Sequence, residues 1–100
     1  MVISDGFYVK GRPHPRLYGT FPMLLGDISR KRKWLSLPEA VHKITHLPAD
    51  RFHLRGRGLL APGYFADVTV FDAEGIAGPA TYEAPDAPPQ GIRMCFATVD

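Results

Sequence analysis

The sequence contains a single cysteine, Cys95, in 100 residues. One cysteine cannot form an internal disulfide, and a zinc knuckle would need a cysteine pair. The sequence also has no apolar run near the ~20 residues that a membrane-spanning helix requires. Its amino terminus shows no basic segment followed by an apolar one, which is the pattern of a secretory leader. These absences predict a cytoplasmic protein with no membrane partner.

The charge of the chain is unevenly distributed. Residues 1–60 hold eleven Lys and Arg against four Asp and Glu, whereas residues 61–100 hold one against six. A basic half raises the question of a nucleic-acid partner. The densest basic run begins at Arg30 and ends at Lys33, and it would also suit the last turn of a helix, where cations complement the helix dipole. Because no aromatic residues alternate with that run to stack on bases, nucleic acid is the less favoured partner.

Ten prolines and ten glycines predict many turns and short elements. Helical spacing of apolar residues predicts a helix from Thr20 to about residue 33, with Thr20 as its cap and Pro22 in its first turn. Ser36 and Glu39 form a capping-box pattern, which predicts a second helix ending near residues 45–46. Pro48 is expected to open one more short turn over residues 49–52.

Strands are expected at residues 1–4, 66–72 and 91–99 from their apolar, β-branched and aromatic residues. Residues 73–91 are rich in proline and glycine and are expected to form a long loop. Asp67 and Asp72 lie at the two ends of the middle strand and are interpreted as structural, because short polar residues often occupy strand edges.

The segment from residue 4 to residue 22 has the composition of a binding loop on a rigid scaffold. It combines Asp5 with two bases, His14 and Arg16, that stand beside prolines. A residue before proline is restricted to extended backbone, so both bases would be held on a stiff chain. The alternative interpretation is a surface loop with two solvated bases. The histidines at 42, 46 and 53 are interpreted as surface or packing residues, because the glutamate of a zinc-protease helix is missing between the first two.

Two stretches together resemble the D-aminoacylase family, the N-acyl-D-amino-acid deacylases of the amidohydrolase superfamily. The first is Ser-Asp-Gly at 4–6 with His-Pro-Arg-Leu-Tyr-Gly-Thr-Phe-Pro at 14–22. The second is the capped helix start at 36–41, a Thr-x-x-Pro-Ala step at 45–49 and Arg-Gly-Leu-Leu-Ala-Pro-Gly-Tyr-Phe-Ala-Asp at 57–67. The resemblance extends over nearly the whole chain.

This resemblance implies an α+β fragment of a longer enzyme. Residues 1–54 would form the end of a metal-dependent-hydrolase (β/α) barrel, comprising its last strand, a substrate loop and helices. Residues 55–100 would supply strands of the small C-terminal β-sandwich domain. The family's metal ligands belong to earlier barrel strands, so zinc is expected in the full-length family and not on this chain alone. We therefore expect the isolated chain to be inactive, and to self-associate or pair with the missing barrel portion.

The resemblance also implies roles for individual residues. Asp5 would stand at the tip of the last barrel strand as the catalytic carboxylate, which takes the proton of the attacking water and returns one to the leaving amine. Arg16 would bind the carboxylate of an N-acyl amino acid with its planar fork. His14 would be a second contact, and Tyr18 would line the pocket. The alternative hypothesis is a non-catalytic module that binds nucleic acid or an acidic protein through the run from Arg30 to Lys33.

Overall fold

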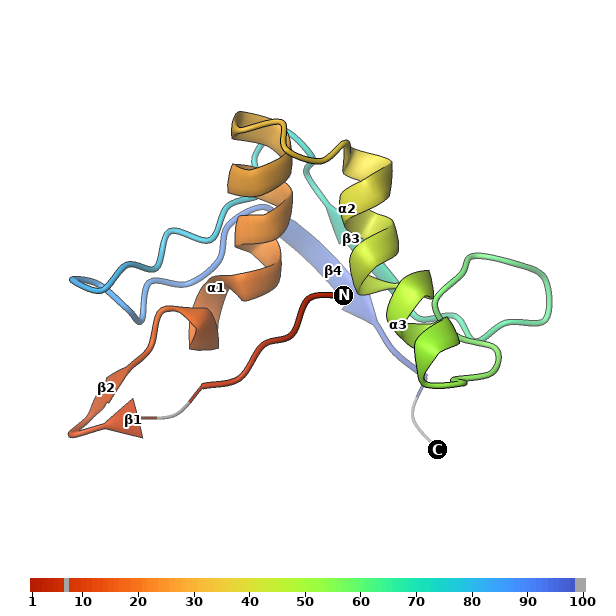
Figure 1. The fold of residues 1–100 in the computed structure, drawn as a ribbon, viewed down its shortest axis with the longest axis horizontal. Coiled ribbons are helices and arrows are strands. Elements are labelled where there is room, and N and C mark those ends of the chain that lie inside the picture. The colour runs from red at the N-terminus through yellow and green to blue at the C-terminus, as the bar shows by residue number, and fades with distance from the viewer. Residues whose placement is uncertain (7, 99–100) are drawn as a thin grey trace.

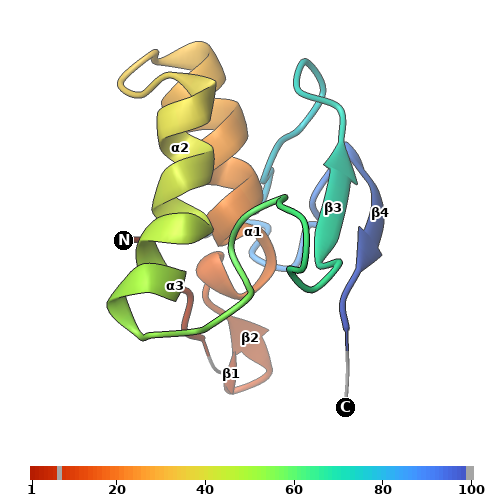
Figure 2. The ribbon, with the colours of Figure 1, turned by 90° about the vertical axis from the view of Figure 1, so that its right-hand side faces the viewer.

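The computed structural model describes residues 1–6 and 8–98 of the chain. Figure 1 shows α1 and the π-helix that continues it beside α2, with the β3–β4 ribbon behind them; Figure 2 shows the helices and this ribbon as two layers. In chain order the elements are β1 Tyr8–Val9, β2 Arg12–Pro13, α1 Arg16–Met23, the π-helix η1 Leu24–Lys31, α2 Leu37–Ile44, α3 His46–Arg51, β3 Val68–Phe71 and β4 Ile92–Phe96.

Helix α1 begins at Arg16, four residues earlier than expected. Its backbone is interrupted at Gly19, where φ is −144° and ψ is 15°. Thr20 does not cap a helix, because its hydroxyl donates to the carbonyl of Arg16 at 2.8 Å. Pro22 lies just after this interruption and has no main-chain N–H. The kink has already broken the helical hydrogen bond that such an N–H would make, so the proline removes no further one. The expectation of a capped start at Thr20 was therefore wrong, although the chain does turn helical again there.

The second helix confirms the capping-box prediction. Ser36 is extended, its hydroxyl accepts the N–H of Glu39 at 3.3 Å, and the Glu39 carboxylate accepts the N–H of Ser36 at 3.4 Å. These bonds satisfy two main-chain donors that a helix start leaves unpaired. Helix α3 begins at His46 and not at residue 49, since proline is tolerated within a first turn and Pro48 does not delay it.

The two later strands form where they were expected, within narrower limits. β3 and β4 pair antiparallel, with Val68 opposite Phe96 and a register shift between Val70 and Phe71. The predicted end of the second strand at residue 99 lies outside the described residues. The expected strand at residues 1–4 is not formed. A strand exists only where its main chain pairs with a neighbour, and no described segment pairs with those residues.

The sequence reading did not anticipate the β1–β2 hairpin. Tyr8 pairs with Pro13 and Val9 with Arg12. The turn between the strands places Lys10 at φ 51° and Gly11 at φ 79°. Two successive positive φ angles are the geometry of the tight turn that suits strand twist, and glycine is the residue best able to adopt it.

Residues 73–91 form a long loop as expected, and the base of this loop, at residues 76–78, is closely packed. Ile76 is 2% exposed and completes a core with Leu24, Leu25 and Ala40. Gly78 meets Gly19 so closely that a Cβ on Gly78 would lie 2.5 Å from the Gly19 carbonyl oxygen. In Figure 1 this loop extends on the same side of the molecule as the β1–β2 hairpin. No helix among the described residues has the length and apolar character to cross a membrane.

Candidate functional site

The structure brings the segment carrying Asp5 against the start of α1. The Ser4 hydroxyl donates to the carbonyl of Arg16 at 3.2 Å. A Cβ on Gly6 would lie 3.0 Å from the Cβ of Leu17, so only glycine allows this approach without a shift of the neighbouring residue. Asp5, between these two contacts, is exposed. Two of the predicted site residues, Asp5 and Arg16, therefore stand on neighbouring segments although eleven positions separate them in the sequence.

His14 precedes Pro15, the N-cap residue of α1, and binds the first turn of this helix. Its Nδ1 accepts the main-chain N–H of Arg16 at 3.1 Å, and its carbonyl accepts that of Leu17 at 3.0 Å. These two donors belong to the first turn, which has no helical partners for its N–H groups. The sequence reading assigned His14 to ligand contact and missed this role, because histidine is not among the usual capping residues.

Arg16 is exposed, and its side chain makes no ion pair with any residue of the described part. One alternative considered from the sequence was pairing with Asp27. That carboxylate instead binds Arg32 at 3.0 Å. The guanidinium of Arg16 is thus free to bind an external carboxylate or phosphate, whose oxygens match its planar fork.

The hydroxyls of Tyr18 and Tyr8 lie 2.6 Å apart. This hydrogen bond raises the pKa of Tyr18, with smaller contributions in the same direction from desolvation, from Tyr8 and from the negative charge of Asp86. Tyr18 thus presents an aromatic edge and a hydroxyl that is hydrogen-bonded to Tyr8. The contact also fixes the β1–β2 hairpin against α1.

A residue from the distant loop joins this cluster. The Tyr82 hydroxyl lies 3.2 Å from His14 Nε2, and the Tyr82 carbonyl accepts from the Arg12 guanidinium at 3.0 Å. The sequence predicted only that Tyr82 lies in a long loop. No local pattern could have joined it to residues about 70 positions earlier, because only the packing of the loop on α1 brings them together.

The basic run from Arg30 to Lys33 is partly committed to contacts within the chain. Arg30 donates to the carbonyl of Ala73 at 3.3 Å. Arg32 pairs with Asp27 and lies 5.0 Å from the ring centre of Trp34. The run therefore lies at the carboxyl end of η1, where cations are favourable. Through Arg30 it also binds the segment after β3.

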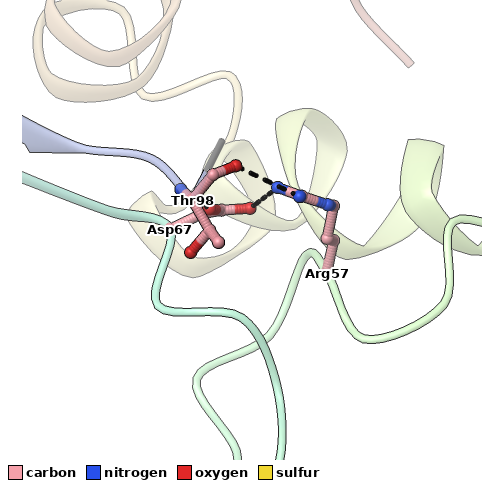
Figure 3. Close-up of polar contacts among 3 residues, drawn as sticks. All are labelled: Arg57, Asp67 and Thr98. Carbon is pink, nitrogen blue, oxygen red and sulfur yellow. Dashed lines mark hydrogen bonds and ion pairs between the residues drawn. The ribbon is translucent and has the colours of Figure 1, made fainter. Parts of the chain in front are cut away.

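Asp67 is structural, as the sequence predicted, and Figure 3 shows its partners. Its carboxylate forms an ion pair with Arg57 and accepts the N–H of Thr98 at 2.7 Å. Arg57 also donates to the carbonyl of Thr98 at 3.3 Å and lies over the ring of Phe65 at 4.4 Å. The Thr98 N–H, together with the Arg57 guanidinium, lowers the pKa of Asp67. Asp72 is structural too, since it accepts the N–H of Glu74 at 3.0 Å.

Among residues 1–6 and 8–98 there is no group of three His, Cys, Asp or Glu side chains that could hold a metal ion. The rings of His42 and His46 lie 5.7 Å apart without a third ligand. Cys95 is exposed on β4 beside the hydroxyl of Thr69. The described residues thus do not fit a metal centre by themselves.

Comparison with known proteins gives one consistent relationship. The pattern of the amidohydrolase family matches residues 11–95. The D-aminoacylase of Alcaligenes xylosoxydans xylosoxydans is 48% identical over 96 residues, which are 96% of this chain and 20% of that protein. This chain therefore spans about one fifth of the length of the relative that it matches.

Solved structures agree with the sequence match. A D-aminoacylase crystal structure superposes with a TM-score of 0.89 at 45% identity, over 93% of this chain and 20% of that one. The N-acyl-D-glutamate deacylase of Bordetella bronchiseptica, solved with zinc and a phosphonate mimic of the tetrahedral intermediate, gives 0.85 at 41% identity. This second match covers 87% of this chain and 18% of the deacylase. The chain thus has the fold of the corresponding part of these enzymes.

Proposed function

The chain belongs to the amidohydrolase family, and from this membership we propose that it is the C-terminal part of an enzyme that hydrolyses the amide bond of N-acyl-D-amino acids. One observation carries the proposal: 48% identity to a D-aminoacylase extends over 96% of the chain. The segment from residue 4 to residue 22, which holds the proposed site residues, lies almost wholly within that match. A chain of one fifth of the enzyme's length would supply part of the active site and not all of it.

We further propose a division of the chain. Residues 1–54 would end the barrel domain and residues 55–100 would contribute strands to the small β domain. Support comes from Figure 2, in which the helices and the β3–β4 ribbon form two layers, with Phe71 of β3 packed against the helical core. The Arg57–Asp67 ion pair joins two residues near the start of the second part, residues 55–100. Catalytic residues of a barrel lie at the carboxyl ends of its strands, which would place Asp5 at the active site.

In this proposal Asp5 moves the proton. Its exposed carboxylate would accept a proton from the water that attacks the amide carbonyl, and would return one to the departing amine. Arg16 would bind the carboxylate of the amino-acid moiety through two parallel hydrogen bonds. Tyr18 would border the substrate, and His14, whose Nε2 lies 3.2 Å from the Tyr82 hydroxyl, would be a second contact.

Relatives of this chain have been solved with zinc, as in the N-acyl-D-glutamate deacylase. The described residues of this chain do not form a three-ligand cluster, and a catalytic zinc takes about three protein ligands. The ligands would come from the rest of the enzyme, and we expect the chain alone to show no zinc-dependent amide hydrolysis.

A chimera tests the proposal. This chain would replace the matching 96 residues of the Alcaligenes D-aminoacylase, and hydrolysis of N-acetyl-D-leucine would be measured. We expect turnover by the chimera and its loss by about 10²–10⁴-fold in Asp5→Asn, which keeps the shape of the side chain but loses the base. The matched control is Asp50→Asn, an exposed carboxylate on α3. A folded chimera without activity, or an Asp5→Asn chimera as fast as its parent, would contradict the proposal.

A further inference from the structure

Tyr82 makes three contacts with Arg12 of β2 and with His14, which follows that strand. Its carbonyl accepts from Arg12, its hydroxyl lies 3.2 Å from His14 Nε2, and its ring meets the His14 ring edge to face at 5.3 Å and 84°. Arg12 and His14 are two positions apart, so an extended chain presents both on the same side. Tyr82 remains 74% exposed. Burial therefore does not explain its placement, whereas the polar contacts do.

The hydrogen bonds of His14 fix its tautomer. Nδ1 accepts the main-chain N–H of Arg16, so this nitrogen carries no proton in the observed geometry. A neutral imidazole then bears its proton on Nε2. Nε2–H must accordingly donate to the Tyr82 hydroxyl, which accepts. The Tyr82 hydroxyl oxygen thus holds the His14 ring in the orientation in which Nδ1 accepts the Arg16 N–H.

The loop that carries Tyr82 is itself anchored to the same helical segment. Gly78 packs on Gly19 of α1, and a Cβ on Gly26 of η1 would lie 2.2 Å from the Ile76 carbonyl oxygen. Ile76 is the largest fully buried side chain among the described residues. Because the base of the loop cannot shift without disturbing the core, packing sets where the loop leaves α1, and the contacts with Arg12 and His14 then set the position of Tyr82.

We propose that Tyr82 is a positioning residue for the carboxylate site. By accepting the Nε2–H of His14, it keeps Nδ1 directed at the Arg16 N–H and so orients the first turn of α1, from which the Arg16 side chain extends. The identity of the ligand rests on the proposed function. The positioning of Arg16 by Tyr82 and His14 rests only on the contacts within this chain.

The test is nuclear magnetic resonance of the whole chain with Tyr82→Phe, which keeps the ring and removes the acceptor. The matched control is Tyr64→Phe, a tyrosine whose hydroxyl has no hydrogen-bond partner among the described residues. In the wild type we expect a slowly exchanging His14 Nε2–H signal and ring nitrogen shifts of the Nε2–H tautomer. In Tyr82→Phe we expect that signal to broaden, and the Arg16 amide to exchange about two- to tenfold faster, since one net hydrogen bond is lost. Amides of η1 and α2 should not change.

Two results would overturn the proposal. One is an unchanged His14 signal and Arg16 amide in Tyr82→Phe. The other is equal acceleration at every amide, which would make Tyr82 only a contributor to overall stability. Hydrolysis of N-acetyl-D-leucine by the chimera with Arg16→Lys separates this inference from the proposed function. An unchanged KM would contradict the carboxylate role, while the exchange data would still decide the role of Tyr82.

Discussion

At the scale of single residues, Arg57 and Asp67 connect the two ends of the second half of the chain, which no local sequence pattern predicted. Arg57 precedes β3 and Asp67 adjoins it, whereas Thr98 follows β4. The ion pair and the two hydrogen bonds to Thr98 therefore close the open end of the β3–β4 ribbon (Figure 3). A carboxylate that accepts a main-chain N–H beside a guanidinium favours its charged form.

This cluster predicts a pH dependence of stability. The pKa of Asp67 is lower in the folded chain than its ordinary value, so its stabilising contribution is present above the unfolded pKa of about 3.9 and is lost as pH falls through the folded pKa. Asp67→Asn should lower the urea midpoint at pH 7, and the difference from wild type should shrink toward pH 3.

Asp50→Asn is the control for that measurement, because Asp50 is exposed and forms none of the ion pairs found among the described residues. It should leave both the midpoint at pH 7 and its acid dependence unchanged. Parallel acid dependences for wild type and Asp67→Asn would show that the carboxylate charge does not matter.

Arg16 gives a second prediction at this scale. In the active chimera, Arg16→Lys keeps the positive charge but loses the planar fork. Because hydrogen bonds to charged groups contribute about 1.5–3 kcal/mol, we expect KM to rise by about 10- to 100-fold. Steady-state kinetics would measure this, with the exposed Arg55→Lys as the control. An unchanged KM would remove Arg16 from the substrate site.

At the scale of elements, the loop 73–91 is attached to the helices through glycines. Gly19 on α1 and Gly26 on η1 both face main-chain atoms of residues 76–78. Main chain that approaches main chain this closely leaves no room for a side chain, which is one reason that glycine occurs within otherwise helical segments. This close contact is what allows Ile76 to reach the core.

The loop predicts a contrast between two substitutions. In Gly78→Ala the new Cβ would lie 2.5 Å from the Gly19 carbonyl oxygen and 3.0 Å from the Met23 nitrogen, which are main-chain atoms. In Gly75→Ala it would meet the end of the Asp72 side chain at 2.6 Å, which can rotate away. We expect Gly78→Ala to lower the free energy of unfolding by about 1–3 kcal/mol, and Gly75→Ala to cost clearly less. Urea denaturation would compare them, and equal losses would contradict the close packing of the loop.

At the scale of the whole molecule, the chain has a small core and much exposed apolar surface. Its radius of gyration is 14.5 Å, against about 13 Å for a compact domain of 100 residues. All five residues of β4 are exposed, and within the described part of the chain β3 and β4 form a sheet of two strands. Such a pair is marginally stable in water unless a further strand or layer covers it.

We therefore expect the isolated chain to self-associate, or to bind the remaining portion of the enzyme when that is supplied. Apolar side chains at Ile92, Met94 and Phe96 are 44–56% exposed and favour such contacts. Light scattering across a concentration series should show a mass above that of one chain. In hydrogen exchange, the main-chain amides of the helices should be more strongly protected than those of the strands. A monomer with equally protected residues 68–71 and 92–96 would contradict this expectation.

The sequence by itself determined the features that depend on neighbouring residues. The capping box at Ser36 and Glu39 satisfies donors within three positions, so it could be predicted and is confirmed. The β-branched run of β3 and the structural role of Asp67 were also readable, because short polar residues at a strand edge have few other uses. The family resemblance was carried by contiguous motifs, and the comparisons confirm it.

Tertiary structure alone decided where distant segments meet. The strand predicted at residues 1–4 is absent because a strand needs a partner that its own sequence cannot supply. His14 and Tyr82 meet where the loop, which packs on Gly19 through Gly78, returns to the start of α1. Hydrogen bonds between residues about 70 positions apart leave no local periodicity, since their energy depends on the packing of everything between them.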